Sequence, residues 1–178
     1  PLQLTLDSDI QFLVRKELMR FNNIFQSKGS AAILMNIHNG NILSLVSLPD
    51  FDPNKRENIK DKNYINKITK GVYELGSVFK TFTLAAALDE NLIEVDTKFI
   101  DLEKSINCGN NTIREYDKKI PKDLTAEEIL IRSGNIGSVR IGQKVGIARF
   151  KLFLENIGVL NKIEFDIEEV GQPITSKW

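Results

Sequence analysis

The sequence contains a single cysteine, Cys108, and a single histidine, His38, among its 178 residues. One cysteine excludes an intramolecular disulfide, and a metal or redox site would need partners that are lacking, so Cys108 is interpreted as a small apolar residue. His38 lies in a turn rich in asparagine and glycine, a poor place for the base of a serine–histidine mechanism. Any acid–base chemistry must therefore rest mainly on other side chains.

An excess of charge of one sign is also lacking. The 24 lysines and arginines balance the 24 aspartates and glutamates, so the formal net charge is zero. This balance gives no electrostatic reason to expect nucleic acid or an anionic membrane as a partner. The sequence has no apolar run of membrane-spanning length and no signal-peptide or lipidation pattern. With 42% hydrophobic and 27% charged residues, its composition is that of an ordinary globular domain.

Two local patterns stand near the start of the sequence. Apolar residues recur at helical spacing from about residue 7 to residue 25, and Asp7 suits the N-cap, so an amphipathic helix is predicted. Two β-rich runs, 31–37 and 42–48, flank an Asn-Gly pair, which predicts a β-hairpin. Because the first run is apolar at nearly every position, we expect that strand to be covered on both faces.

Helices dominate the second half. Residues 77–90 are apolar around nearly the whole helix, which is typical of a buried helix. Thr125 and Glu128 form a capping box that opens the next helix, and a Ser-Gly-Asn triplet at 133–135 ends it. Further helices are predicted at 136–145 and 147–156, and the segments 54–70 and 101–122 are polar and irregular. We expect an α+β fold with helices packed on an antiparallel sheet. Two strands alone make a marginal sheet, so the hairpin needs further strands that this sequence does not obviously supply.

Ser77 and Lys80 are the first candidate site. A helix places residues three apart on one face, and Ser77 falls at the helix N-terminus, where free N–H groups favour developing negative charge. A neutral lysine there can take the serine proton, so that the serine attacks a carbonyl carbon. Burial or neighbouring donors must then lower the lysine pKa well below its usual value of about 10.4. A lone Ser-x-x-Lys pair is expected about once by chance in this sequence. The case for a site therefore depends on the preceding Gly76 and on the apolar helix that follows.

Ser133 and Asn135 are the second candidate site. A serine hydroxyl at this place can relay protons between a lysine and a leaving group. An asparagine amide offers a donor and an acceptor, which suits a peptide backbone in a cleft. The same triplet is typical of an ordinary helix-ending turn, because serine, glycine and asparagine are favoured in turns. Taken alone, these residues favour the ordinary turn over a catalytic site.

In this order, the two pairs resemble the penicillin-binding protein and serine β-lactamase superfamily. The first family motif matches at Ser77 and Lys80, and the second matches at Ser133 and Asn135. The likeness covers nearly the whole chain and is greatest to the septal-division branch of the class B penicillin-binding proteins. Four other runs resemble that family, at 5–11, 31–48, 51–54 and 73–77.

Two features of the sequence depart from the family pattern. Leu75 stands where the family usually has proline, which affects only the stiffness of the approach to the helix. The third motif, Lys-Thr/Ser-Gly, is absent; in the family it lies on a strand that donates an oxyanion-hole N–H and holds the substrate carboxylate. The resemblance therefore implies that residues 1–178 are the N-terminal portion of a single transpeptidase domain, cut at both ends, with the membrane anchor and third-motif region absent. It also implies that the α+β fold is incomplete, with C-terminal strands missing.

The resemblance implies a peptidoglycan D,D-transpeptidase in which Ser77 attacks the penultimate D-Ala carbonyl of a stem peptide and releases the terminal D-Ala. Lys80 would be the base, Ser133 a proton relay and Asn135 a substrate ligand. β-Lactams would acylate the same serine. The family implies no metal or organic cofactor, and it implies cell-division membrane proteins as partners. It also implies a place at the cytoplasmic membrane, with the catalytic domain facing the periplasm or the outside.

Other interpretations stay open. A β-lactamase or β-lactam sensor shares both motifs, although no acidic residue after Ser133 falls in an arrangement assignable to deacylation. A non-catalytic binding module could use the same fold, although Ser77 and Lys80 are intact, and a plain α+β domain could carry the motifs by coincidence. Without the third motif, we expect the isolated chain to be at best a very poor acyltransferase. We also expect the edge of the 31–48 hairpin to allow self-association.

Overall fold

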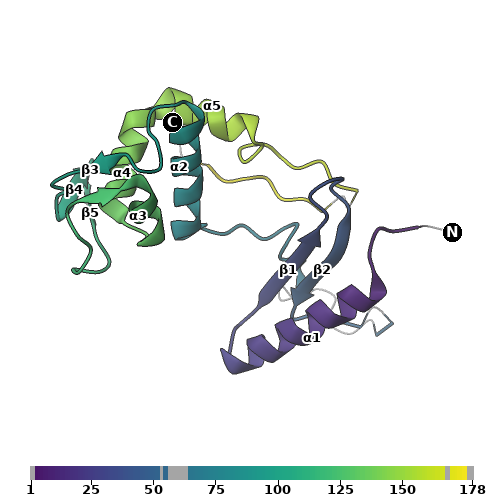
Figure 1. Ribbon diagram of the computed structural model, residues 1–178. Helices are drawn as coiled ribbons and strands as arrows, with labels where there is room; N and C mark the ends of the chain where they lie inside the picture. The colour runs from purple at the N-terminus through teal and green to yellow at the C-terminus, as the bar shows by residue number, and fades with distance from the viewer. Residues whose placement is uncertain (1–2, 53, 56–63, 167–168, 176–178) are drawn as a thin grey trace. The chain divides into compact units, whose positions relative to one another are not determined.

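The computed structural model describes residues 3–52, 54–55, 64–166 and 169–175 (Figure 1). The chain divides into two compact units, one formed by residues 1–73 with 163–172 and the other by residues 74–162 with 173–178. Among the described residues, a long α-helix and a β-hairpin belong to the first unit, and the other α-helices and strands belong to the second. All four candidate site residues lie in the second unit.

The first unit opens with the predicted helix, α1 (Ser8–Ile24). Asp7 is its N-cap, because one carboxylate oxygen accepts the backbone N–H groups of Asp9 and Ile10, each at 3.0 Å. No residue of α1 is fully buried, and Phe12 remains 69% exposed. The amphipathic pattern therefore predicted the helix correctly but not how much apolar surface it leaves open.

The predicted hairpin consists of β1 (Ser30–Met35) and β2 (Ile42–Leu48), paired antiparallel. Gly40 in its turn has a φ of +75°, in the left-handed region that glycine adopts without steric cost. The Asn36 carbonyl accepts the Gly40 N–H at 2.8 Å, which closes the turn. The Asn-Gly pair thus occupies the turn that its chemistry predicted.

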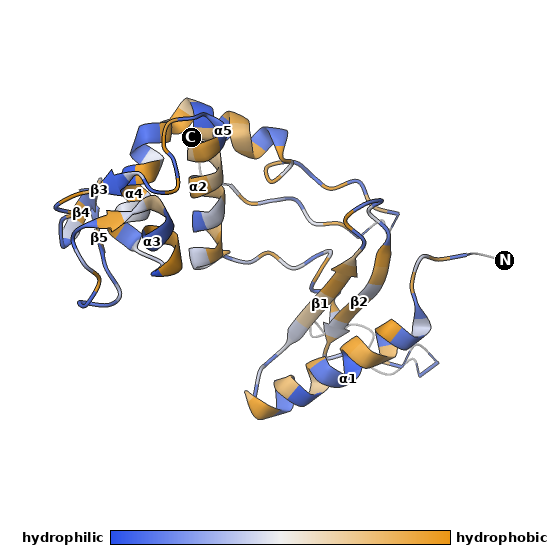
Figure 2. Cartoon of the chain, viewed as in Figure 1, coloured by the Kyte–Doolittle hydropathy of each residue, from blue (hydrophilic) through white to orange (hydrophobic). Residues whose placement is uncertain are grey.

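The prediction that the first strand is covered on both faces is wrong for the described chain. Ile33, Leu34 and Met35 are 49%, 43% and 51% exposed, and Figure 2 shows β1 as a largely apolar ribbon. By contrast, β2 buries Val46 and Leu48 almost completely. An apolar run shows that a strand is able to be buried. Whether it is buried depends on which elements pack against it.

Residues before and within α1 cover the outer edge of β2. The Gln11 side-chain amide accepts the Leu45 N–H through Oε1 and donates to the Leu45 carbonyl through Nε2, both at 2.9 Å, as a neighbouring strand would. The Asp7 N–H donates to the Leu43 carbonyl at 3.0 Å. Within the described residues, β1 is therefore the open edge of the hairpin, and self-association through it stays a prediction.

In the second unit, the 3₁₀-helix η2 (Gly76–Phe79) leads directly into α2 (Lys80–Asp89). Helix α2 contacts α3 (Ala126–Ile131), α4 (Asn135–Val145) and α5 (Ile147–Asn156). The core between these helices includes Leu84, Ala86, Ala87, Ile129, Ile136 and Ile141. These helices match the predicted ones within a few residues.

The helix that carries Lys80 is less buried than its apolar sequence predicted. Leu84, Ala86 and Ala87 are buried, but Ala85 is exposed, and Val78 of the preceding η2 is 64% exposed. The partners of α2 cover only part of its circumference. The helix also begins differently from the prediction, because residues 76–79 form a 3₁₀ turn and α-helical geometry starts at Lys80.

Two short antiparallel pairs complete the second unit. Strand β3 (Lys98–Phe99) pairs with β6 (Leu124–Thr125), and β4 (Ser105–Cys108) pairs with β5 (Asn111–Arg114). The segment 101–122, expected to be irregular, therefore contains a hairpin. Cys108 is exposed at its tip and is not a packed apolar residue. With antiparallel strands and packed helices, the described chain confirms the α+β class.

Candidate active site

Ser77 and Lys80 lie on η2 and at the first position of α2. In a 3₁₀ turn, residues i and i+3 eclipse one another, so Ser77 lies one turn directly before Lys80. The backbone N–H of Lys80 donates to the Ser77 carbonyl. Ser77 is exposed, and its hydroxyl forms no hydrogen bond to another described residue. Its hydroxyl is therefore open to a ligand.

The turn between α3 and α4 positions Ser133. The Ser133 N–H donates to the Leu130 carbonyl at 2.9 Å, and the Gly134 N–H donates to the Ile129 carbonyl at 2.8 Å. These two bonds form a Schellman motif, in which glycine usually takes the left-handed position. Ser133 occupies it with a φ of +53°. A residue with a Cβ costs about 1–2 kcal/mol in this conformation, so the serine is held there against local preference.

Three oxygen atoms surround the amine of Lys80. Lys80 Nζ lies 2.5 Å from the Ser133 carbonyl oxygen, 3.0 Å from Ser133 Oγ and 2.6 Å from Asn135 Oδ1. The carbonyl and amide oxygens can only accept hydrogen bonds, so they take two N–H groups of the lysine. The Ser133 hydroxyl can either accept the third or, when the lysine is neutral, donate to its lone pair. This arrangement allows a proton to pass between Lys80 and Ser133.

Asn135 opens α4 and is held at both ends of its side chain. Its Nδ2 donates to the Arg114 carbonyl at 2.7 Å, while Oδ1 accepts from Lys80. The capping box of Thr125 and Glu128 is present as predicted and fixes the start of the preceding helix. The structure thus brings Lys80, Ser133 and Asn135 into contact.

Glu115 is a site residue that nothing in the sequence singles out. Its Oε2 accepts the Asn135 N–H at 2.7 Å, and its Oε1 accepts the Ile136 N–H at 2.9 Å. A glutamate in a polar segment twenty positions before Asn135 carries no local signal of this role. The contact arises only because the chain after β5 folds back over the start of α4.

The surroundings of Lys80 lower the pKa of its amine. Partial burial of Lys80 lowers its pKa from the ordinary value of 10.5, and the negative charge of Glu115 opposes that shift in part. The direction is the one required of a lysine that acts as a base.

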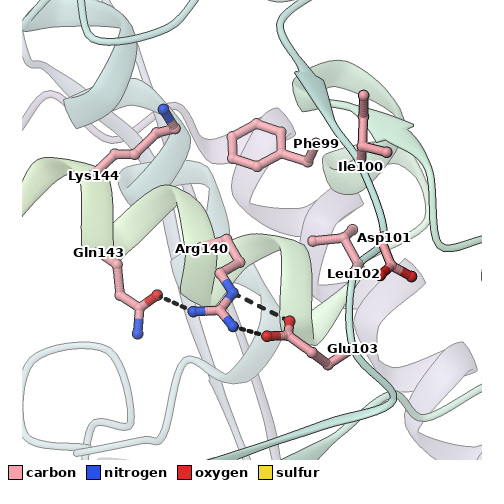
Figure 3. Close-up of a pocket in the computed structure, with 8 residues that line it drawn as sticks. All are labelled: Phe99, Ile100, Asp101, Leu102, Glu103, Arg140, Gln143 and Lys144. Atoms are coloured by element: carbon pink, nitrogen blue, oxygen red, sulfur yellow. Dashed lines mark hydrogen bonds and ion pairs between the residues drawn. The ribbon is translucent and has the colours of Figure 1, made fainter.

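An open pocket of about 380 Å³ lies elsewhere in the second unit (Figure 3). It is lined by Phe99, Ile100, Asp101, Leu102, Glu103, Arg140, Gln143 and Lys144. Its Arg140 guanidinium is paired with the Glu103 carboxylate and donates to Gln143 Oε1 at 2.7 Å. No candidate site residue lines this pocket, and its Asp101 pairs with Lys122, which lies outside the lining.

The described residues offer neither a metal site nor a membrane-spanning helix. Among them, no group of three or more His, Cys, Asp and Glu side chains is arranged to hold a metal ion. In that same part of the chain, no helix has the length and apolar character needed to cross a membrane.

Residues 30–178 match the sequence model of a family described as the penicillin binding protein transpeptidase domain. The chain belongs to this family. The resemblance carried by the Ser77–Lys80 and Ser133–Asn135 pairs is thereby confirmed. A curated penicillin-binding protein relative is the "Probable peptidoglycan D,D-transpeptidase FtsI" of Caulobacter vibrioides. It is 32% identical over 179 residues, and the alignment covers 100% of this chain and 30% of the relative.

Solved structures show the same fold. A peptidoglycan glycosyltransferase from Burkholderia ambifaria superposes with a TM-score of 0.84 at 23% identity, covering 99% of this chain and 51% of the other. The transpeptidase (TP) domain of Burkholderia pseudomallei penicillin-binding protein 3 gives 0.79 at 23% identity, covering 94% and 46%. The chain thus spans about half of these solved chains and less than a third of the curated relative. The family match and the relatives support the assignment of this chain to the transpeptidase domain of a class B penicillin-binding protein.

Proposed function

We propose that the full-length protein is a serine-type peptidoglycan D,D-transpeptidase with Ser77 as its nucleophile. The observation that carries the proposal is the contact of Lys80 Nζ with Ser133 Oγ and Asn135 Oδ1. This contact lies one 3₁₀ turn after an exposed serine. The family and the name of the Caulobacter relative support the same activity.

The proposed reaction has two halves. Ser77 Oγ bonds to the penultimate D-Ala carbonyl carbon as its proton passes to neutral Lys80. The C–N bond then breaks, and the proton moves through Ser133 to the departing amine of the terminal D-Ala. In the second half, an amine of a neighbouring stem peptide attacks the acyl carbon, the ester C–O bond breaks, and a proton returns to Ser77. Asn135 would hold the substrate backbone with the amide hydrogen that Arg114 leaves free.

The same proposal covers ligands, partners and location. The ligands are peptidoglycan stem peptides and β-lactams, which would acylate Ser77 in place of the peptide. The partners are cell-division membrane proteins. The location is the cytoplasmic membrane, with the catalytic domain on its outer side. Support for these points comes from the family and the relatives.

Labelling with a fluorescent penicillin tests the nucleophile. We expect the full-length protein to form a covalent adduct at Ser77, and Ser77→Ala to abolish it. Ser105→Ala, which removes an exposed serine on β4, should label like the wild type. An adduct mapped to Ser133 or Ser138 in the wild type would show that Ser77 is not the nucleophile.

The lifetime of the adduct separates the proposal from its alternatives. A transpeptidase adduct with a β-lactam should persist, whereas a β-lactamase would hydrolyse it and turn over nitrocefin. A non-catalytic binding module would form no adduct at all. We expect the isolated 178-residue chain to label far more slowly than the full-length protein, since loss of one oxyanion-hole donor alone costs about 100- to 1,000-fold. Equal labelling rates would show that the third motif is not needed.

A further inference from the structure

Glu115 connects two parts of the site that are distant in sequence. It follows β5, is half-buried, and grips two consecutive backbone N–H groups, those of Asn135 and Ile136, with its two carboxylate oxygens. The distances of 2.7 and 2.9 Å are those of charge-assisted hydrogen bonds. A carboxylate in this position therefore does more than occupy solvent-exposed surface.

Helix α4 needs such a partner. Its N-cap is Gly134, which has no side chain to accept the first free N–H groups, and its first turn contains no acidic residue. Glu115 supplies the missing acceptors from another segment of the chain. Its negative charge also complements the positive end of the helix dipole.

The first residue of α4 is Asn135, whose side chain faces Lys80. The neighbouring carbonyl of Arg114 accepts the Asn135 Nδ2 at 2.7 Å, which turns Oδ1 toward the lysine. Arg114 and Glu115 together hold the backbone and the side chain of one residue. A shift of this pair would move Asn135 relative to Lys80.

We propose that Glu115 is a positioning residue of the active site, whose carboxylate fixes the first turn of α4 and thereby the Asn135 side chain against Lys80. The inference deepens the proposed function and rests on it for its kinetic consequence. It adds a group that belongs to neither family motif found in the sequence. Glu115 does not touch the nucleophile or the substrate in this scheme; it acts through Asn135 and through its charge.

The charge of Glu115 has a second measurable effect, on the pKa of Lys80. Glu115 raises the Lys80 pKa, while burial lowers it. The polar contacts of Lys80 Nζ, in Ser133 and Asn135, are uncharged. The side chains around the lysine stem are also uncharged: Thr83, Leu84, Ile129, Leu130, Ser138 and Ile141. Removing the Glu115 charge should therefore lower the Lys80 pKa further.

The test compares Glu115→Gln and Glu115→Asp with Glu128→Gln in the full-length protein. Glu128 is the matched control because it also caps a helix, α3, through the Thr125 N–H. The measurements are acylation by fluorescent penicillin across pH, hydrogen exchange of the Asn135 and Ile136 amides, and Lys80 titration by NMR of labelled lysine.

For Glu115→Gln, we expect acylation at the pH optimum to fall about 10- to 100-fold, because small displacements of a reacting group cost this much. The rising limb of the pH profile should move to lower pH, and the two amides should exchange on the order of tenfold faster. Glu115→Asp keeps the charge, so its rising limb should stay near that of the wild type. Glu128→Gln should lower thermal stability without shifting the rising limb of the pH profile.

Two outcomes separate failure of this inference from failure of the proposed function. If the wild type labels at Ser77 but Glu115→Gln behaves like Glu128→Gln, the inference is overturned and the proposed function stands. If the wild type does not label at Ser77, the proposed function fails. The positioning role is then decided by amide exchange and Lys80 titration, and values unchanged in Glu115→Gln would overturn it.

Discussion

Lys80 Nζ lies 2.6 Å from Asn135 Oδ1, although 55 positions separate the two residues in the chain. Each residue is the first of its helix, α2 or α4, so the contact joins two helix N-termini. The positive ends of helix dipoles disfavour a cation and favour an anion. The place is therefore suited to a lysine that gives up its proton and to a substrate oxygen that gains negative charge.

Replacing Lys80 with arginine should remove the base and keep the charge. Arginine does not lose its proton in proteins, so we expect acylation to fall by about 100-fold or more, with little change in thermal stability. The measurement is the second-order rate of penicillin acylation. Lys98→Arg, at the exposed position of β3, is the matched control. A Lys80→Arg rate within a few-fold of the wild type would remove Lys80 from the mechanism.

Stability should depend on pH through Lys80. Because burial lowers its pKa in the folded state below the 10.5 of the unfolded chain, the unfolded state binds more protons between these two values. The Lys80 contribution to the free energy of unfolding therefore rises with pH through that window and is lost as pH falls through the folded-state pKa. Urea titrations of the wild type and Lys80→Met, compared between neutral pH and pH 10, isolate this contribution. Parallel curves for the two proteins would contradict it.

At Ser133, the backbone conformation favours glycine, whereas the side-chain contact with Lys80 requires a hydroxyl. Ser133→Gly and Ser133→Ala both remove the hydroxyl and its hydrogen bond with Lys80, while the backbone carbonyl contact remains, and both should acylate slowly. At a φ of +53°, however, glycine avoids the steric cost, so the Gly variant should be more stable than the Ala variant by about 1 kcal/mol. Denaturant unfolding measures the difference. Equal stabilities would mean that the left-handed turn relaxes when the hydroxyl is removed.

Two glycines of α4 should respond oppositely to alanine. A Cβ on Gly137 would come within 2.5–2.8 Å of three Ile129 side-chain atoms, and Ile129 is 1% exposed. Overpacking of this kind costs about 1–3 kcal/mol. A Cβ on Gly142 would meet only Thr83 Cγ2 at 3.5 Å, so Gly142→Ala should gain up to about 1 kcal/mol of helix propensity. Thermal unfolding of both variants tests the α3–α4 packing, and a neutral Gly137→Ala would refute it.

The candidate site was readable from sequence where chemistry follows a motif. The Ser77–Lys80 spacing, the helix-ending triplet at 133–135 and the capping box before it are short patterns. Their meaning depends on a few consecutive residues. Glu115 could not be read in this way, because a glutamate has the same appearance whether it caps a distant helix or faces water. Its role depends on the fold of the segment after β5.

Sequence alone determined the local elements: α1 with its Asp7 cap, the β1–β2 hairpin, and the succession of α3, α4 and α5. These follow from periodicity, capping and turn chemistry, which act over one or two turns of chain. Tertiary structure alone decided the exposure of β1, the β4–β5 hairpin in a polar segment, and the approach of Lys80 to Asn135. Burial and long-range contacts depend on which surfaces meet when the whole chain packs, and no short stretch of sequence carries that information.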